Sequence, residues 1–206
     1  MKRIFLFLLT LLPLWAFAQN APKREFRGAW IQIINGQFQG MSRHQMQANL
    51  TNQLNVLQAC GVNTIIFQVR GEADALYQSP YEPWSRFLTG KQGQTPSPYW
   101  DPLAWMIEEC HKRNMELHAW INPYRVSFNK ETLNQFKQSQ YASWLNSDET
   151  IYCGDNKYIL NPASQKARNL IVDGIKEIVE NYQVDGIHFD DYFYIEGSYG
   201  NTTKQS

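Results

Sequence analysis

The sequence predicts a (β/α)8 TIM-barrel-type fold, of which this chain holds only the N-terminal half, about four βα units. Four short segments rich in apolar and β-branched residues have the length of buried strands, and they alternate with helical patterns (residues 28–32, 64–70, 116–122 and 185–190). Such alternation is typical of parallel βα units. A complete barrel takes about 250 residues, whereas this chain has 206. We therefore expect a fragment of a longer gene product, with a small open sheet as the alternative.

The first 18 residues have the features of a secretory signal peptide. Lys2 and Arg3 precede an apolar run over 4–17, and Ala16-Phe17-Ala18 matches a cleavage signal. The run is shorter than the ~20 apolar residues of a membrane span. We therefore expect a secreted or periplasmic protein that is not stably inserted in the membrane after cleavage, with its barrel domain over residues 19–206.

Composition and cysteine spacing exclude several classes of partner. Removing the two basic residues of the signal peptide leaves a slightly acidic mature chain, because the whole sequence has a formal net charge of +0. This balance argues against a nucleic-acid partner. The three cysteines form no C-x-x-C pair and no His/Cys cluster, so no structural zinc site and no cofactor are expected.

Three long helices are predicted between the strands. Ser42 and Gln45 have the spacing of a capping box at the start of the first helix. Asp101-Pro102 begins the second helix, which runs to about Asn114, with Asp as the cap and Pro in the first turn. Asn161-Pro162 is expected to cap the third helix, which extends to Tyr182.

Two long connections separate these elements. Residues 71–100 form a loop rich in proline and aromatic residues, and residues 124–160 form a second segment that we expect to be helical around 130–145. Functional side chains are often carried on such loops.

Side chains alternate along each predicted strand in a way that separates a core face from a polar face. Aliphatic or small residues occupy one face of the second, third and fourth strands. The other face is polar or aromatic and is expected to point into the barrel; it carries Gln68 and Arg70, then His118, Trp120 and Asn122, then His188 and Asp190. Chemistry in such barrels lies at the carboxyl ends of the strands.

Glycoside hydrolysis is the chemistry that fits these strand ends, because it needs two carboxyl groups across a sugar ring. Asp190 and Asp191 are the catalytic candidates. Adjacent strand residues point to opposite faces, so the two are not expected to form the catalytic pair with each other. The candidate substrate-binding residues are Arg70, Glu72, Asp74, Trp120, Asn122, Tyr124, Arg125, His188 and Tyr192.

Structural roles for the same residues stay open. An Asp-Asp pair at a strand end also occurs as a helix cap or a solvated turn. Arg70 could simply neutralise a buried acid.

Two other functions are compatible with the sequence. A metal-dependent polysaccharide deacetylase can carry a similar Phe-Asp-Asp run, but its His-x-x-x-His ligand pair is not present among the four histidines. The other alternative is a non-catalytic barrel fragment that binds glycan through its aromatic residues.

Four ordered motifs carry a resemblance to a known family. They are Arg27-Gly28-Ala29-Trp30, the run from Asn63 to Arg70, the run from Ala119 to Arg125, and the run from Asp185 to Phe193. The sequence resembles the glycosyl-hydrolase-like ten family, which consists of secreted bacterial (β/α) barrels formerly described as a domain of unknown function. The resemblance implies a glycosidase that acts on bacterial envelope glycan or another polysaccharide, with peptidoglycan glycan strands as one substrate. It also implies a barrel that continues past residue 206.

Overall fold

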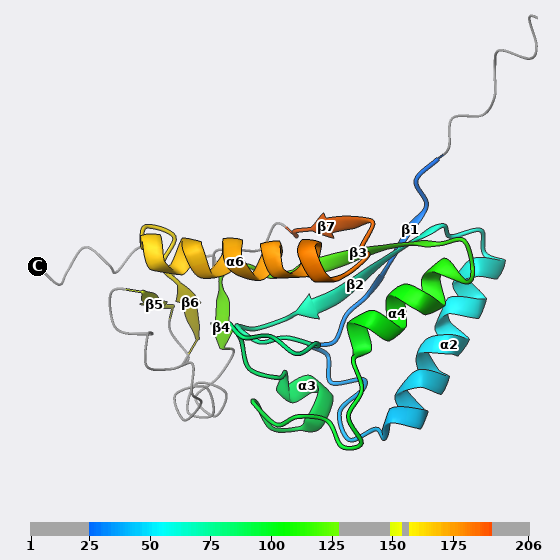
Figure 1. Ribbon diagram of the computed structural model, residues 1–206, viewed down its shortest axis with the longest axis horizontal. Helices are drawn as coiled ribbons and strands as arrows, with labels where there is room; N and C mark the ends of the chain where they lie inside the picture. The colour runs from blue at the N-terminus through cyan, green and yellow to red at the C-terminus, as the bar shows by residue number, and fades with distance from the viewer. Residues whose placement is uncertain (1–24, 128–148, 154–156, 191–206) are drawn as a thin grey trace, which may run out of the picture.

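The computed structural model describes residues 25–127, 149–153 and 157–190 (Figure 1). Its main sheet has four strands in the order β1-β2-β3-β7, and every neighbouring pair is parallel. The strands are β1 (Gly28–Ile31), β2 (Thr64–Arg70), β3 (Glu116–Ile121) and β7 (Gly186–His188). The predicted arrangement of parallel βα units, as in half of a barrel, is confirmed. The fourth strand is shorter than the predicted 185–190, and Phe189 beyond it is 45% exposed.

Three long helices connect these strands: α2 (Arg43–Ala59), α4 (Pro102–His111) and α6 (Gln165–Asn181). The predicted capping box at Ser42 is present, with Gln45 N donating to Ser42 Oγ at 3.3 Å and Ser42 N donating to Gln45 Oε1 at 2.8 Å. Asp101 caps α4 as expected. The predicted start of the last helix is wrong, because Asn161 Oδ1 accepts from Ala163 N in a preceding turn and Ser164 provides the cap.

The core lies between the sheet and these helices. It contains the alternate residues of β2 and β3 that were predicted to face the helices, together with the inner stripe of α2 and most of α4. Ile65, Phe67 and Val69 of β2 are fully buried there, as are Leu117 and Ala119 of β3. The predicted parity is therefore correct, and the polar faces lie on the side of the sheet away from the helices.

A second sheet was not predicted. It is antiparallel with the order β4-β6-β5 and consists of β4 (Arg125–Ser127), β5 (Thr150–Tyr152) and β6 (Tyr158–Leu160). It lies near the start of α6 (Figure 1), where Leu160 packs with Ala167 and Ile171. Strands of three residues are too short to show a period of two, so no pattern along the chain predicts them.

Several predictions fall on residues outside the described ranges. They are the signal peptide, the helix expected around 130–145, and the site residues Asp191 and Tyr192. The short helix α3 (Arg86–Thr89) lies within the long loop after β2. In the described part of the chain, no helix is both long and apolar enough to cross a membrane.

Candidate active site

Parallel pairing places the predicted site residues at one edge of the sheet. Arg70 ends β2, Asn122 follows β3, and Asp190 lies two residues beyond the end of β7. Glu72 and Asp74 follow β2 directly, and Arg125 begins β4 shortly after β3. The carboxyl ends of neighbouring parallel strands lie at the same edge, so the sheet gathers these groups as the sequence predicted.

Arg70 is fixed by contacts within the protein. Its Nε donates to both carboxylate oxygens of Glu82, at 2.7 and 2.8 Å, and its Nη1 donates to the carbonyls of Asn122 and Pro123. Arg70 and Glu82 are both almost fully buried. This ion pair ties the long loop to the ends of β2 and β3, and a substrate contact by Arg70 stays a prediction.

Glu82 was missed by the sequence analysis. It lies in an irregular loop, 12 residues after its arginine partner, so no periodicity marks it. Burial raises its pKa, and the neighbouring guanidinium opposes that shift.

Glu72 and Asp74 form a buried pair of carboxyl groups at the end of β2. Glu72 is fully buried and bound to Arg86, with Nε to Oε2 at 3.0 Å and Nη2 to Oε1 at 3.3 Å. Burial raises the pKa of Glu72 to about 7, against the effect of Arg86, and nearby Asp74 adds to the rise. Asp74 accepts a hydrogen bond from Glu72 N at 3.0 Å, and burial raises its pKa as well. The protonation state of these two buried carboxyl groups therefore sets the charge beneath the surface of the site.

Arg125 is the cation that faces the acidic groups of the site. Its backbone N donates to Asn122 Oδ1 at 3.1 Å, and its Nη1 donates to Gly71 O at 3.2 Å. Burial lowers the pKa of Arg125, while the nearby carboxylates of Asp190, Glu72 and Asp74 counter this effect. The residue therefore joins the ends of β2 and β3 and places its charge beside Asp190.

Aromatic residues and histidines continue the inward face. The ring of Trp30 packs edge-on against Trp120, with centroids 4.8 Å apart, and against His188 at 4.6 Å. Burial lowers the pKa of His188, and so does the neighbouring His118. Trp30 is 52% exposed, whereas Trp120 is only 6% exposed. Tyr124 is partly buried and packs on the small cluster beside β6.

Some buried polar atoms on this face have no hydrogen-bond partner within the described ranges, although nearly all such groups in native proteins are paired. Asn122 and Gln68 are held in one orientation, because their Oδ1 and Oε1 atoms accept from Arg125 N and from Ile33 N. The NH2 groups of these two side chains therefore point away from Arg125 N and Ile33 N. The unpartnered atoms are Gln68 Nε2, Trp120 Nε1, Asn122 Nδ2, His188 Nε2 and Asp190 Oδ1. These donors and this acceptor are shielded from solvent and unpaired within the described residues.

None of the described residues forms a group of three or more His, Cys, Asp or Glu side chains arranged to hold a metal ion. The carboxyl groups described above can support acid–base or nucleophilic chemistry.

Solved structures resemble this fold at low sequence identity. A maltogenic α-amylase, AmyB from Thermotoga neapolitana, aligns with a TM-score of 0.51 and 12% identity over 82% of this chain and 39% of the amylase chain. A hypothetical protein from Ruminiclostridium thermocellum also aligns with a TM-score of 0.51 and 12% identity, over 78% of this chain and 74% of its own. These likenesses concern the fold alone.

Sequence comparison gives closer relatives. Glycosyl hydrolase YngK of Bacillus subtilis is 40% identical over 186 residues, which cover 88% of this chain and 35% of YngK. Glycosyl hydrolase DigH of Escherichia coli K12 is 40% identical over 161 residues, covering 75% of this chain and 36% of DigH. This chain thus spans about a third of the length of these relatives. The model of the family described as glycosyl hydrolase-like 10 matches residues 25–206. The chain belongs to the glycosyl hydrolase-like 10 family.

Proposed function

We propose that this chain supplies part of the active site of a glycoside hydrolase that acts on bacterial envelope glycan or another polysaccharide, with peptidoglycan glycan strands as the first substrate to test. The observation that carries the proposal is the position of Asp190. It lies at the carboxyl edge of the parallel sheet, beside Arg125, with Oδ1 unpartnered among the described residues. The family and its named relatives support the same reaction class.

Asp190 suits the role of the nucleophile or base in this reaction. It is a carboxyl group at the carboxyl edge of the sheet, which is where the catalytic groups of (β/α) barrels lie. Asp191 is the alternative for the same role. The second catalytic carboxyl group is expected from outside the described residues, and its separation from the first would decide between retention and inversion.

Other groups around Asp190 would orient the sugar. The amide NH2 of Asn122 and the indole N–H of Trp120 are donors of the kind that bind sugar oxygens; both atoms are buried, so a sugar would reach them once the side chains above them move. The exposed ring of Trp30 beside them offers an apolar face for stacking. Arg70, Glu72 and Asp74 act in this proposal by holding the strand ends and setting the local charge.

The test is glycan cleavage by the full-length gene product and by its Asp190→Asn and Asp191→Asn variants. Release of reducing ends from peptide-free glycan strands should fall by about 10²–10⁴-fold in at least one variant, the usual range for a lost acid–base group. Glu108→Gln removes a carboxyl that is 69% exposed on the outer helix α4 and serves as the control. Wild-type cleavage in both aspartate variants would refute the assignment.

Two alternatives give different results in the same assay. Binding of glycan with no product from wild-type protein would indicate the non-catalytic fragment. Release of acetate that stops in a chelator would indicate the deacetylase. We also propose that the protein is exported, with residues 1–18 as a signal peptide; N-terminal sequencing of the mature protein would test the cleavage after Ala18.

A further inference from the structure

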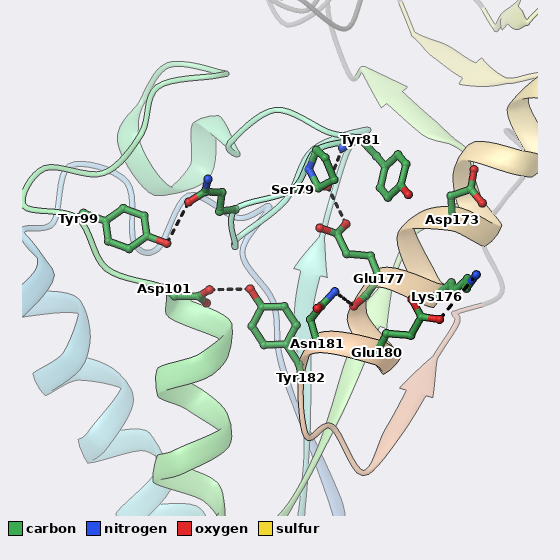
Figure 2. Close-up of a pocket in the computed structure, with 12 residues that line it drawn as sticks. Ser79, Tyr81, Tyr99, Asp101, Asp173, Lys176, Glu177, Glu180, Asn181 and Tyr182 are labelled. Atoms are coloured by element: carbon green, nitrogen blue, oxygen red, sulfur yellow. Dashed lines mark hydrogen bonds and ion pairs between the residues drawn. The ribbon is translucent and has the colours of Figure 1, made fainter.

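A pocket lies on the helix side of the sheet, on the opposite face from Asp190. Its volume is about 570 Å³. Figure 2 shows its walls, which come from the loop after β2, from the start of α4 and from the second half of α6. The lining residues that matter here are Ser79, Tyr81, Tyr99, Asp173, Glu177 and Glu180.

Hydrogen bonds between these elements hold the pocket open. Ser79 Oγ donates to Glu177 Oε2 at 2.8 Å, which fastens the loop to α6. Tyr182 at the end of α6 donates from its hydroxyl to Asp101 Oδ2 at 2.6 Å, which fastens α6 to the start of α4 (Figure 2). Its ring also packs against the buried Tyr77, with centroids 5.4 Å apart. The cavity is therefore largely formed before any ligand arrives, as binding sites usually are.

The wall from α6 is rich in hydrogen-bond acceptors. Asp173, Glu177 and Glu180 are spaced by four and three residues, so they share one face of the helix. The ammonium of Lys176 is already near Glu180, at 3.6 Å. Glu177 is only 9% exposed, and its Oε2 accepts from Ser79. Carboxylate oxygens only accept hydrogen bonds, so a ligand that binds this wall brings hydrogen-bond donors.

Two exposed tyrosine rings flank these acceptors. Tyr81 is 38% exposed and Tyr99 is 54% exposed, and the hydroxyl of Tyr99 is steadied by Gln78 Oε1 at 3.3 Å. Such rings offer apolar faces beside polar groups. The excess of carboxylates disfavours a polyanion, and in the described part of the chain no acidic cluster has the arrangement of a metal site. A hydroxyl-rich, uncharged ligand with C–H faces satisfies both the carboxylates and the rings.

We propose that this pocket is a secondary glycan-binding site, which holds one or two sugar units of a polysaccharide on the outer helix layer while another stretch of the chain occupies the active site. The choice of glycan rests on the proposed function. Sugar hydroxyls donate to Glu177, Asp173 and Glu180, and a sugar ring stacks on Tyr99 or Tyr81.

The test measures glycan binding in the background of whichever aspartate variant, Asp190→Asn or Asp191→Asn, has lost cleavage. Peptide-free peptidoglycan glycan strands serve as the probe, and affinity is measured by calorimetry on the full-length gene product. Tyr81→Ala combined with Tyr99→Ala should weaken binding by about tenfold or more, since stacking and burial at an exposed aromatic contact are worth about 1.5 kcal/mol. Tyr152→Ala removes a tyrosine that is 55% exposed on β5, away from the pocket, and should leave affinity unchanged.

A second variant keeps the test decisive if the double substitution does not fold. Glu177→Gln retains an oxygen that accepts from Ser79 and replaces the other carboxylate oxygen by an NH2 donor, so it should also weaken binding. Unchanged affinity in the folded pocket variants, or a loss of the same size in Tyr152→Ala, would overturn the proposal. Tighter binding of choline, a simple organic cation, than of glycan to the pocket would also overturn the proposal.

Activity separates this proposal from the catalytic one. In otherwise wild-type protein, Tyr81→Ala with Tyr99→Ala should leave cleavage of a short soluble oligosaccharide unchanged and slow cleavage of long strands. Failure of the wild-type protein to cleave glycan would refute the proposed function alone, because binding to the pocket is measured without turnover.

Discussion

Replacing Glu72 by Gln should change how stability depends on pH. The side chain of Glu72 is fully buried, and burial raises its pKa from 4.5 to about 7. Because the folded-state pKa lies above the unfolded value, the native state binds this proton more tightly than the unfolded state. The stability gained from this tighter proton binding is complete below about pH 4.5, and it is lost as the pH rises to about 7. A rise of about 2.5 in the pKa of Glu72 corresponds to a change in the free energy of unfolding on the order of 3 kcal/mol.

Urea unfolding at about pH 4.5 and about pH 8 measures this difference. Wild-type protein should lose on the order of 3 kcal/mol more free energy of unfolding across this range than Glu72→Gln, whose amide does not titrate. Asp74 acts in the same direction in both proteins, because burial also raises its pKa. Glu108→Gln, on the exposed side of α4, should keep the wild-type pH dependence. Parallel pH profiles for wild type and Glu72→Gln would refute the reasoning.

Three further results are expected. Glu82→Ala should lower the free energy of unfolding by about 3–5 kcal/mol in a urea titration, because it leaves a buried guanidinium without its partner; a loss below about 1 kcal/mol would contradict this. Gly186→Ala should destabilise by about 1–3 kcal/mol, since its Cβ would lie 2.9 Å from the ring of His118, while Gly174→Ala, which meets nothing within 4 Å inside α6, should stabilise by about 0.5–1 kcal/mol; equal effects of the two glycine substitutions in thermal melts would be inconsistent with this packing. Residues 19–206 expressed alone should self-associate and lack activity on glycan, because Trp30 is exposed beside open parallel edges at β1 and β7 in the described sheet; light scattering that shows a compact monomer with a sharp melt would disprove it.

Trp30 and Trp120 differ in burial, although both lie on the same, inward face of the sheet. Trp120 is buried, because β3 is an inner strand: His188 of the neighbouring β7 lies beside Trp120 in the register, and Trp30 of β1, two strands away, packs edge-on against its ring. Trp30 lies on the edge strand β1 and has a neighbour on one side only. Position within the sheet, which no single strand encodes, decides the burial.

The sequence by itself determined the features that depend on neighbouring residues along the chain. Alternation placed Gln68 and Arg70 on the face away from the helices, and the capping pattern of Ser42 and Gln45 marked the start of α2. The sequence predicts these features because side-chain direction and capping are local properties of the backbone. Parallel strands then brought Asn122 and Asp190 to one edge.

Only the tertiary structure decided which charges meet. Arg70 pairs with Glu82 and Arg86 with Glu72, across 12 and 14 residues of irregular loop, and Arg125 comes to face Asp190 from another part of the chain. A loop without periodicity carries no signal of where its side chains will lie, because their positions follow from the closure of the loop against the sheet. The pocket between the loop after β2 and α6 depends on the same closure, through the contact of Ser79 with Glu177. The local pattern of the sequence thus fixes the faces of the strands, while long-range packing selects the partners of the charged groups.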